Sequence, residues 1–137
     1  MAHSYTSLWY HLVWSTKYRQ PLLEKAWRWR LYDCIRHYCQ YKGYHFDCAN
    51  GVEDHVHVLV SLKPTLAISD VIRNIKTHSY FWVRENIPNQ EGFGWQDGYA
   101  AFSVGERHIS ALRRYIYDQE RHHQRLSFLE EYKRLRK

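Results

Sequence analysis

The sequence predicts an α+β fold built on one antiparallel sheet, and three observations carry this prediction. Four segments rich in β-branched and aromatic residues have the length of strands. Three other segments carry apolar residues at three- and four-residue steps, which is typical of amphipathic helices. The chain has 137 residues, which suits one domain. We therefore expect a single domain over 1–137, with the order β-α-β-β-α-β-α.

The first strand and the first helix are predicted by composition and by helix end signals. Residues 5–14 (YTSLWYHLVW) are aromatic and β-branched, as strand residues are. Pro21 favours the start of a helix, because its fixed φ suits the first helical turn. Gly43 suits the end of that helix, because glycine adopts the left-handed conformation without strain.

A β-hairpin is predicted next. Residues 44–49 and 52–62 both have strand composition. Asn50 and Gly51 lie between them and tolerate positive φ, which makes this pair a strong signal for a tight turn.

The pattern of residues 65–104 predicts a helix, a loop and a last strand. Apolar residues from Ile68 to Val83 recur at helical steps, and Thr65 or Ser69 is expected near the helix cap. Residues 87–98 contain glycine and proline and predict a long loop, of the kind that often carries function. Residues 99–104 predict the fourth strand.

A final helix is predicted from Glu106 onward. Ile109, Leu112 and Ile116 form its apolar stripe. Residues 126–137 end in a basic cluster, and we expect this basic C-terminal tail to fold back as a short amphipathic helix.

The first six elements match the split β-α-β, ferredoxin-like arrangement, in which two helices cover one face of an antiparallel sheet. The last helix is additional to that arrangement. We therefore expect the second face of the sheet to be open, and a functional site to lie there.

The composition favours a partner with negative charge. The formal net charge is +6 with a pI near 9.3, and aromatic residues make up 17% of the chain. A basic, aromatic surface favours nucleic acid, because phosphates attract cations and bases stack on rings; a basic protein without such a partner is the alternative. The content of apolar residues excludes a disordered chain.

The compartment is predicted from cysteines and hydropathy. Three cysteines without a CxxC pair fit a reducing environment. A run of about 20 apolar residues and a signal-peptide pattern are both missing from the sequence. We therefore expect a cytoplasmic protein without a membrane partner.

A candidate metal site lies in the third predicted strand. His55 and His57 are separated by one residue, so they point to one face of the strand, whereas the alternating valines point to the other. Two imidazoles on one face can bind one divalent cation, and a metal there can orient a phosphate. The alternative is a pair of surface or hydrogen-bonded core histidines. Asp54 either orients a ligand histidine or is a carboxylate beside the turn.

A candidate nucleophile lies in the last predicted helix. Tyr115 and Gln119 are four residues apart and share a helix face beside the apolar stripe. A tyrosine hydroxyl can attack a phosphodiester, and the glutamine oxygen can bind a metal. The alternative is a packing tyrosine with a solvated glutamine. Tyr117 is the less favoured nucleophile because it faces another direction and has no glutamine four residues on.

Cationic and aromatic side chains are candidates for contacts to DNA. Cations would bind phosphates and give affinity without sequence information, and rings would stack on unpaired bases. Each of these residues could instead be a solvated or a core residue. His122 and His123 either approach the metal site from the next helical turn or are solvated or in contact with phosphates. The candidates are Lys17, Arg19, Arg73, Lys76, Trp95, Tyr99, Arg113, Arg114, Arg121 and Arg125.

Four segments read together resemble a known family. They are YHLVWSTKYR, HVHVLVSL, WQDGYAAFSV and YIYDQ, in that order. The chain resembles, over residues 8–125, the single-tyrosine HUH transposases of small bacterial insertion sequences and the REP-associated tyrosine transposases. The HVH segment alone is a weak signal, whereas the four segments together are specific.

The resemblance implies roles for individual residues. His55, His57 and Gln119 match the ligands of Mg²⁺ or Mn²⁺, and Tyr115, carried by the C-terminal helix, matches the nucleophile. The implied enzyme is a metal-dependent transposase and single-strand DNA endonuclease. It cleaves and rejoins single-stranded DNA at hairpin-bearing ends through a 5′-phosphotyrosine intermediate. A homodimer is implied as well, in which the subunits exchange final helices and share active sites.

Two other functions remain open at this point. A non-catalytic ferredoxin-like module can bind nucleic acid through its sheet, although RNP-type aromatic runs are missing from the central strands. A host-adopted, inactive derivative would keep the same residues. Covalent product formation on DNA distinguishes the enzyme from the binding module, and the hairpins that flank the gene distinguish a mobile-element enzyme from the host-adopted derivative.

Overall fold

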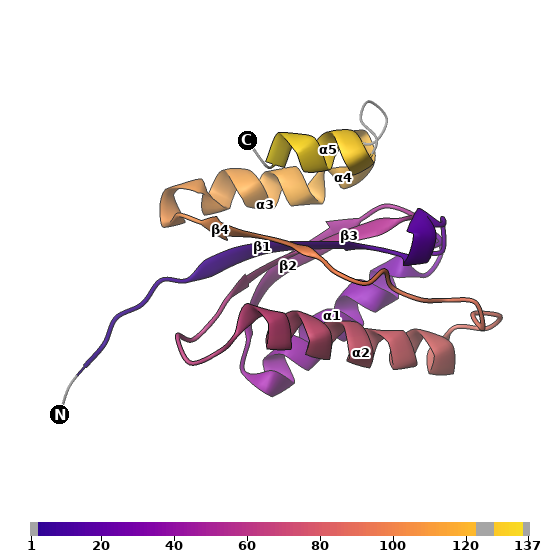
Figure 1. The fold of residues 1–137 in the computed structure, drawn as a ribbon, viewed down its shortest axis with the longest axis horizontal. Coiled ribbons are helices and arrows are strands. Elements are labelled where there is room, and N and C mark those ends of the chain that lie inside the picture. Colours follow the sequence, from indigo (N-terminus) through magenta and orange to yellow (C-terminus); the bar gives the residue numbers. More distant parts are fainter. Residues whose placement is uncertain (1–2, 123–127, 136–137) are drawn as a thin grey trace.

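The computed structural model, which describes residues 3–122 and 128–135, has a four-stranded antiparallel sheet with helices on both faces (Figure 1). The strands lie in the order β2-β3-β1-β4. The elements are β1 (Trp9–Ser15), η1 (Lys17–Arg19), α1 (Arg28–Lys42), β2 (His45–Gly51), β3 (His55–Ser61), α2 (Ile68–Asn86), β4 (Ala100–Val104), η2 (Glu106–His108), α3 (Ile109–Tyr117), α4 (Gln119–His122) and α5 (Phe128–Leu135).

The predicted fold class is confirmed. The order β1-α1-β2-β3-α2-β4 and the central position of β3 and β1 are those of the ferredoxin-like arrangement. Helices α1 and α2 cover one face (Figure 1). The expectation of an open second face is wrong, because α3, α4 and α5 lie over it (Figure 1). The tail contributes to this layer, since α5 forms a helix as expected.

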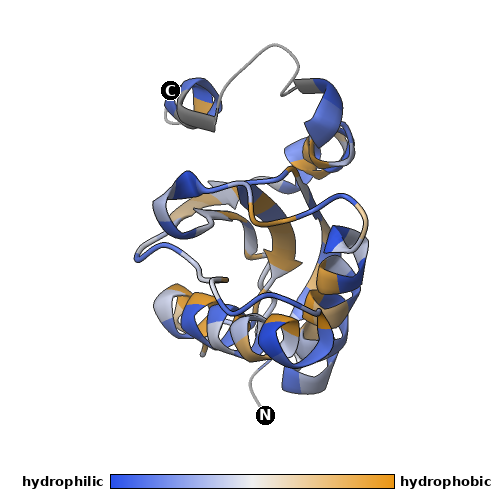
Figure 2. Ribbon diagram, turned by 90° about the vertical axis from the view of Figure 1, so that its right-hand side faces the viewer, coloured by the Kyte–Doolittle hydropathy of each residue, from blue (hydrophilic) through white to orange (hydrophobic). Residues whose placement is uncertain are grey.

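Strand β3 separates two environments. Val56, Val58 and Val60 point into the main core, where they pack with α1 and α2. Leu59 points to the other face and packs with Ile109 and Ile116 of α3. Figure 2 shows hydrophobic residues gathered on the strands and on the helix sides that face them. His55 and His57 therefore lie on the α3 side of the sheet, as the alternation predicted.

Several element ends differ from the predictions. Strand β1 begins at Trp9 rather than at residue 5, and α1 begins at Arg28, well after Pro21. Gly43 ends α1 with φ 78°, as predicted. The cap of α2 is Ala67 without a side-chain hydrogen bond, so neither Thr65 nor Ser69 caps it. Within the described residues, the helices are too short or too polar to cross a membrane.

The predicted Asn50-Gly51 turn is also wrong. Both residues belong to β2, and the connection to β3 lies at residues 52–54. Asn50 instead donates two hydrogen bonds from Nδ2, at 3.1 Å to the carbonyl of Ile116 and at 3.0 Å to that of Tyr117. Asn50 thus satisfies carbonyls at the end of α3, which local turn statistics do not anticipate.

Helix α3 is held on β2 by a second polar contact. Arg113 donates two hydrogen bonds to the carboxylate of Asp47, at 2.8 Å from Nε and at 2.7 Å from the guanidinium end. The Arg113 guanidinium lowers the pKa of Asp47. Asp47 lies at a register shift of β2 between Phe46 and Cys48. This irregularity turns the carboxylate toward α3.

Gly51 is required by close packing at the end of β2. A Cβ built there would lie far inside van der Waals contact with the carbonyl oxygen of His55 and 3.0 Å from Cα of Val56. We expect Gly51→Ala to lower the free energy of unfolding by about 1–3 kcal/mol, as overpacked sites do. Chemical denaturation measures this change.

Gly92→Ala is the control, because a Cβ at Gly92 meets nothing within 4 Å. Equal stability of the two variants would contradict the packing argument for Gly51.

Candidate active site

The two histidines of β3 form the centre of the site. Across the ladder, His57 pairs with Val13 and His55 pairs with Ser15. Both imidazoles are 0% exposed. They lie on the predicted face, but they are covered rather than open to solvent, because the C-terminal layer lies over them.

The Nδ1 atom of each imidazole has a partner. His55 Nδ1 lies 2.8 Å from Oδ1 of Asp54, so this carboxylate is in position to orient the ring. His57 Nδ1 lies 2.7 Å from Nε2 of His11. The sequence analysis missed His11. The only signal for it was the alternation of β1, which places His11 on the face of Val13 and Ser15.

His11 is uncharged at neutral pH. Burial and the neighbouring His57 lower the pKa of His11 to about 3, so its ring is neutral. One of the two rings donates its N–H to the other across the 2.7 Å contact, and the tautomer decides which one. Arrangements of this kind, with one ring nitrogen held by a partner, orient metal-binding histidines.

Tyr115 lies beside these histidines in the same chain. The ring centroids of Tyr115 and His57 are 6.0 Å apart, in an edge-to-face arrangement. Tyr117 is 58% exposed, so the structure brings the favoured tyrosine and not its neighbour to the histidines. Burial, followed by the hydrogen bond and the charge of Glu131, raises the pKa of Tyr115 above its ordinary value. The phenol is therefore protonated, and attack on a phosphate would need its proton removed.

Gln119 is the remaining residue of the predicted set, and the structure places it next to Tyr115. It begins α4 after a break in the helix at Asp118, and its side chain is 0% exposed. Its Nε2 donates to the carbonyl of Tyr115 at 3.5 Å. Its Oε1 has no hydrogen-bond partner among the residues that the structure describes. A buried amide oxygen of this kind is a suitable ligand for a hard divalent cation.

Glu131 of α5 also reaches the site, and the sequence analysis missed it. Its Oε1 lies 2.6 Å from Nε2 of His57 and 3.4 Å from Nε2 of His55. One ligand atom from each of these three residues lies within 4.8 Å of the others. Burial opposes a charge on His55, but the hydrogen bonds and charges of Asp54 and Glu131 outweigh it and raise its pKa. No sequence motif connects Glu131 to the histidines.

A buried arginine holds α4 near the site. Arg28 of α1 donates to Glu120 Oε1 at 2.7 Å and to the carbonyl of Leu23 at 3.2 Å. Lys25 lies 3.3 Å from the other carboxylate oxygen of Glu120. Because Glu120 follows Gln119, these contacts anchor the backbone of α4 next to Gln119.

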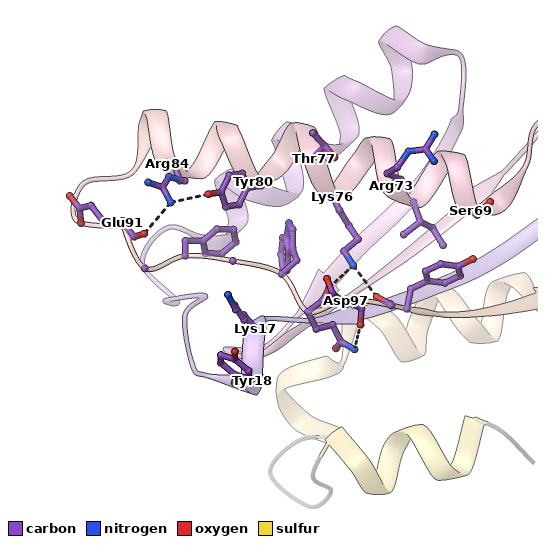
Figure 3. Close-up of a pocket in the computed structure, with 18 residues that line it drawn as sticks. Lys17, Tyr18, Ser69, Arg73, Lys76, Thr77, Tyr80, Arg84, Glu91 and Asp97 are labelled. Atoms are coloured by element: carbon purple, nitrogen blue, oxygen red, sulfur yellow. Dashed lines mark hydrogen bonds between the residues drawn. The ribbon is translucent and has the colours of Figure 1, made fainter.

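Five of the ten DNA-binding candidates line one groove on the opposite side of the molecule from α3 and α5 (Figure 3). The groove has a volume of about 910 Å³ and lies between α2 and the loop that precedes β4. Its candidate residues are Lys17, Arg73, Lys76, Trp95 and Tyr99. The sequence predicted these side chains individually, but not that they gather in one place.

Not all of these groups are available to a ligand. Lys76 donates from Nζ to the carbonyls of Gln96 and Gly98, at 2.6 Å and 2.9 Å, so it holds the loop in place (Figure 3). Trp95 packs edge-to-face on Trp14. Among the five, Lys17, Arg73 and Tyr99 are the exposed ones.

Four of the other five candidates lie in the described part of the chain and do not line this groove. Arg113 is engaged with Asp47, whereas Arg19, Arg114 and Arg121 are exposed elsewhere. Arg125 lies outside the described residues, as does His123. His122 belongs to α4.

Comparison with known proteins gives a consistent result. The family described as IS200-like transposases matches residues 4–119. The ISDra2 transposase TnpA of Deinococcus radiodurans is 29% identical over 117 residues, covering 80% of this chain and 82% of the relative. The transposase of insertion sequence IS200 from Salmonella typhimurium is 25% identical over 123 residues, covering 85% of this chain and 79% of the relative.

Solved structures agree with this comparison. The crystal structure of a Deinococcus radiodurans R1 transposase superposes with a TM-score of 0.70 and 26% identity, covering 87% of this chain and 96% of that one. A REP-associated tyrosine transposase bound to a REP hairpin superposes with a TM-score of 0.56 and 14% identity, covering 85% and 67%, and shares the fold. The ferredoxin-like sheet, the buried histidine pair beside a tyrosine and the family match together show that this chain belongs to the IS200-like transposases.

Proposed function

We propose that this transposase cleaves and rejoins single-stranded DNA through a 5′-phosphotyrosine intermediate, with Tyr115 as nucleophile. One observation carries the proposal. The Tyr115 ring lies 6.0 Å from that of His57, whose own orientation is fixed by His11. A phenol and a pair of oriented imidazoles on one face can act on the same phosphate.

We propose His55, His57 and Gln119 as ligands of Mg²⁺ or Mn²⁺. The fit rests on the buried Oε1 of Gln119 and on the two imidazoles whose Nδ1 atoms are already engaged. When bound, such a cation polarises a phosphoryl oxygen and offsets the charge that develops on it.

The chemistry of the tyrosine can be written as a balanced exchange. The Tyr115 oxygen forms a bond to phosphorus while the bond from phosphorus to the 3′ oxygen breaks. The phenol loses its proton, and the leaving 3′ oxygen gains one. The phosphotyrosine bond retains the energy of the broken linkage, so attack by a 3′ hydroxyl rejoins DNA without ATP.

The groove beside α2 is proposed as the surface that holds the DNA strand. Exposed cations and a tyrosine line it, and these groups suit phosphates and unpaired bases. Thr16 donates its backbone N–H to the carbonyl of Asp54 at 2.9 Å, so the groove residue Lys17 lies at the same sheet end as His55. The groove and the histidine pair therefore approach each other at one end of the sheet. The related REP-associated transposase, which is bound to a REP hairpin, supports hairpin-bearing DNA as the substrate.

We further propose a homodimer in which the C-terminal helices are exchanged. Two observations support this dimer: the family resemblance, and the packing of α3 in an apolar cluster of its own, apart from the main core. Ile109 and Ile116 bury α3 in an apolar cluster distinct from the main core, so this layer could pack on a second copy through the same contacts.

Removal of the phenol oxygen tests the nucleophile. We expect Tyr115→Phe to form no covalent adduct with labelled single-stranded DNA from the gene flanks, while DNA binding is kept. A denaturing gel measures the adduct and a mobility shift measures binding. Tyr117→Phe is the control and should retain the adduct, because Tyr117 is 58% exposed. Adduct formation by Tyr115→Phe at the wild-type rate would refute the assignment.

Removal of an imidazole tests the metal requirement. We expect His57→Ala to lose cleavage and to bind Mn²⁺ at least roughly 100-fold more weakly. Mutation of a residue that only hydrogen-bonds to a metal ligand already weakens metal binding by about 10–100-fold, and loss of the ligand itself should have at least as large an effect. His37→Ala is the control, because the His37 side chain is 63% exposed on α1. Cleavage that persists in EDTA contradicts a metal-dependent reaction.

A mixture of inactive variants tests the exchanged dimer. Tyr115→Phe and His57→Ala are refolded together, so that one composite site of each mixed dimer holds both Tyr115 and His57. We expect adduct formation to return on mixing. If it stays absent while mixed dimers form, the site is built within one chain.

A further inference from the structure

Glu131 is a charged residue buried at the centre of the site. It is 1% exposed, although it belongs to the C-terminal helix α5 and follows the predicted motifs by 12 residues or more. A buried carboxylate is costly unless a positive partner and hydrogen bonds compensate it. Its carboxylate lies at short range from the Nε2 atoms of the two histidines and forms a hydrogen bond with Tyr115.

Three atoms that can each bind a proton or a cation face one another at this point. With the Nδ1 atoms of His55 and His57 engaged by Asp54 and His11, the Nε2 atoms are left to face the Glu131 carboxylate. Two imidazole nitrogens and a carboxylate oxygen repel one another unless a proton or a cation lies between them.

The two distances from Glu131 to the imidazoles suit a shared metal. Ligand atoms about 2.1 Å from an octahedral cation are about 3 Å from their neighbours. The Glu131 oxygen lies 2.6 Å from one Nε2 and 3.4 Å from the other, on either side of that value.

We propose that Glu131 is a ligand of the same divalent cation as His55 and His57, so that metal binding fixes α5 over the active site. This inference rests on the proposed function for its metal, and it adds an anionic ligand to the neutral set of two histidines and Gln119. A carboxylate favours hard cations such as Mg²⁺ and Mn²⁺.

A shared cation would fasten α5 to the sheet. It would join β3, through His57, to α5, through Glu131, and these two residues are more than 60 positions apart in the chain. Glu131 also forms a side-chain hydrogen bond to Tyr115, which, after burial, contributes to the raised pKa of the phenol.

The test measures Mn²⁺ binding to the full chain by calorimetry, without DNA. Glu131→Gln keeps the size of the side chain and removes its charge, and Glu131→Ala removes the ligand. Glu130→Gln is the matched control, because Glu130 is the exposed neighbour on the same helix. We expect 10–100-fold weaker Mn²⁺ binding for both Glu131 variants, as an order of magnitude, and wild-type binding for the control.

Hydrogen exchange supplies a second readout. Mn²⁺ should slow exchange of the α5 amides in the wild type and not in Glu131→Gln. Circular dichroism in metal-free buffer shows that the variants are folded.

The outcomes separate this inference from the proposed function. Wild-type or tighter Mn²⁺ binding by the Glu131 variants, or α5 exchange that Mn²⁺ does not change, overturns the role of Glu131. If His57→Ala still loses the metal in that case, the proposed function stands. If the wild type binds no Mn²⁺, both the metal-dependent function and the role of Glu131 fail.

Discussion

The hydrogen bonds at the Nδ1 atoms of His55 and His57 are the constraint on which the site depends. Asp54 holds one ring at 2.8 Å and His11 holds the other at 2.7 Å. With these nitrogens engaged, the Nε2 atoms must face the C-terminal layer. The valines of β3 reinforce the arrangement, because their burial against α1 and α2 fixes which side of the strand the histidines occupy.

The sheet and its helices could be predicted because the signals for them are local. Alternation in HVHVLV assigned the faces of β3, and the helical period found α1, α2 and α3. Asn50 and Gly51 were misread because their turn preference is also local, whereas a tertiary contact decides their conformation. Asn50 bonds to the end of α3, and Gly51 lies against the His55 carbonyl.

The candidate site was predictable where it depends on single elements. His55 and His57 share a strand, and Tyr115 and Gln119 are four residues apart, so spacing alone grouped each pair. His11 and Glu131 could not be found in this way. His11 meets His57 only through the pairing of β1 with β3, and Glu131 depends on the path of the chain after α4.

The ten candidate contacts to DNA show a further limit of sequence reasoning. The sequence shows which side chains are positively charged, but it does not show whether each one already has a partner within the protein. Arg113 is paired with Asp47, and Lys76 holds backbone carbonyls, so both serve the fold. Lys17, Arg73 and Tyr99 lie in the groove with exposed side chains.

The register shift in β2 has a consequence for self-association. Strands β2 and β4 are the two edges of the sheet, and an edge with regularly spaced backbone groups invites another strand to pair with it. The bulge between Phe46 and Cys48 interrupts that spacing along β2. Strand β4 pairs with β1 in unbroken register. A strand from a second molecule would therefore extend the sheet more readily at β4, away from the edge on which α3 rests.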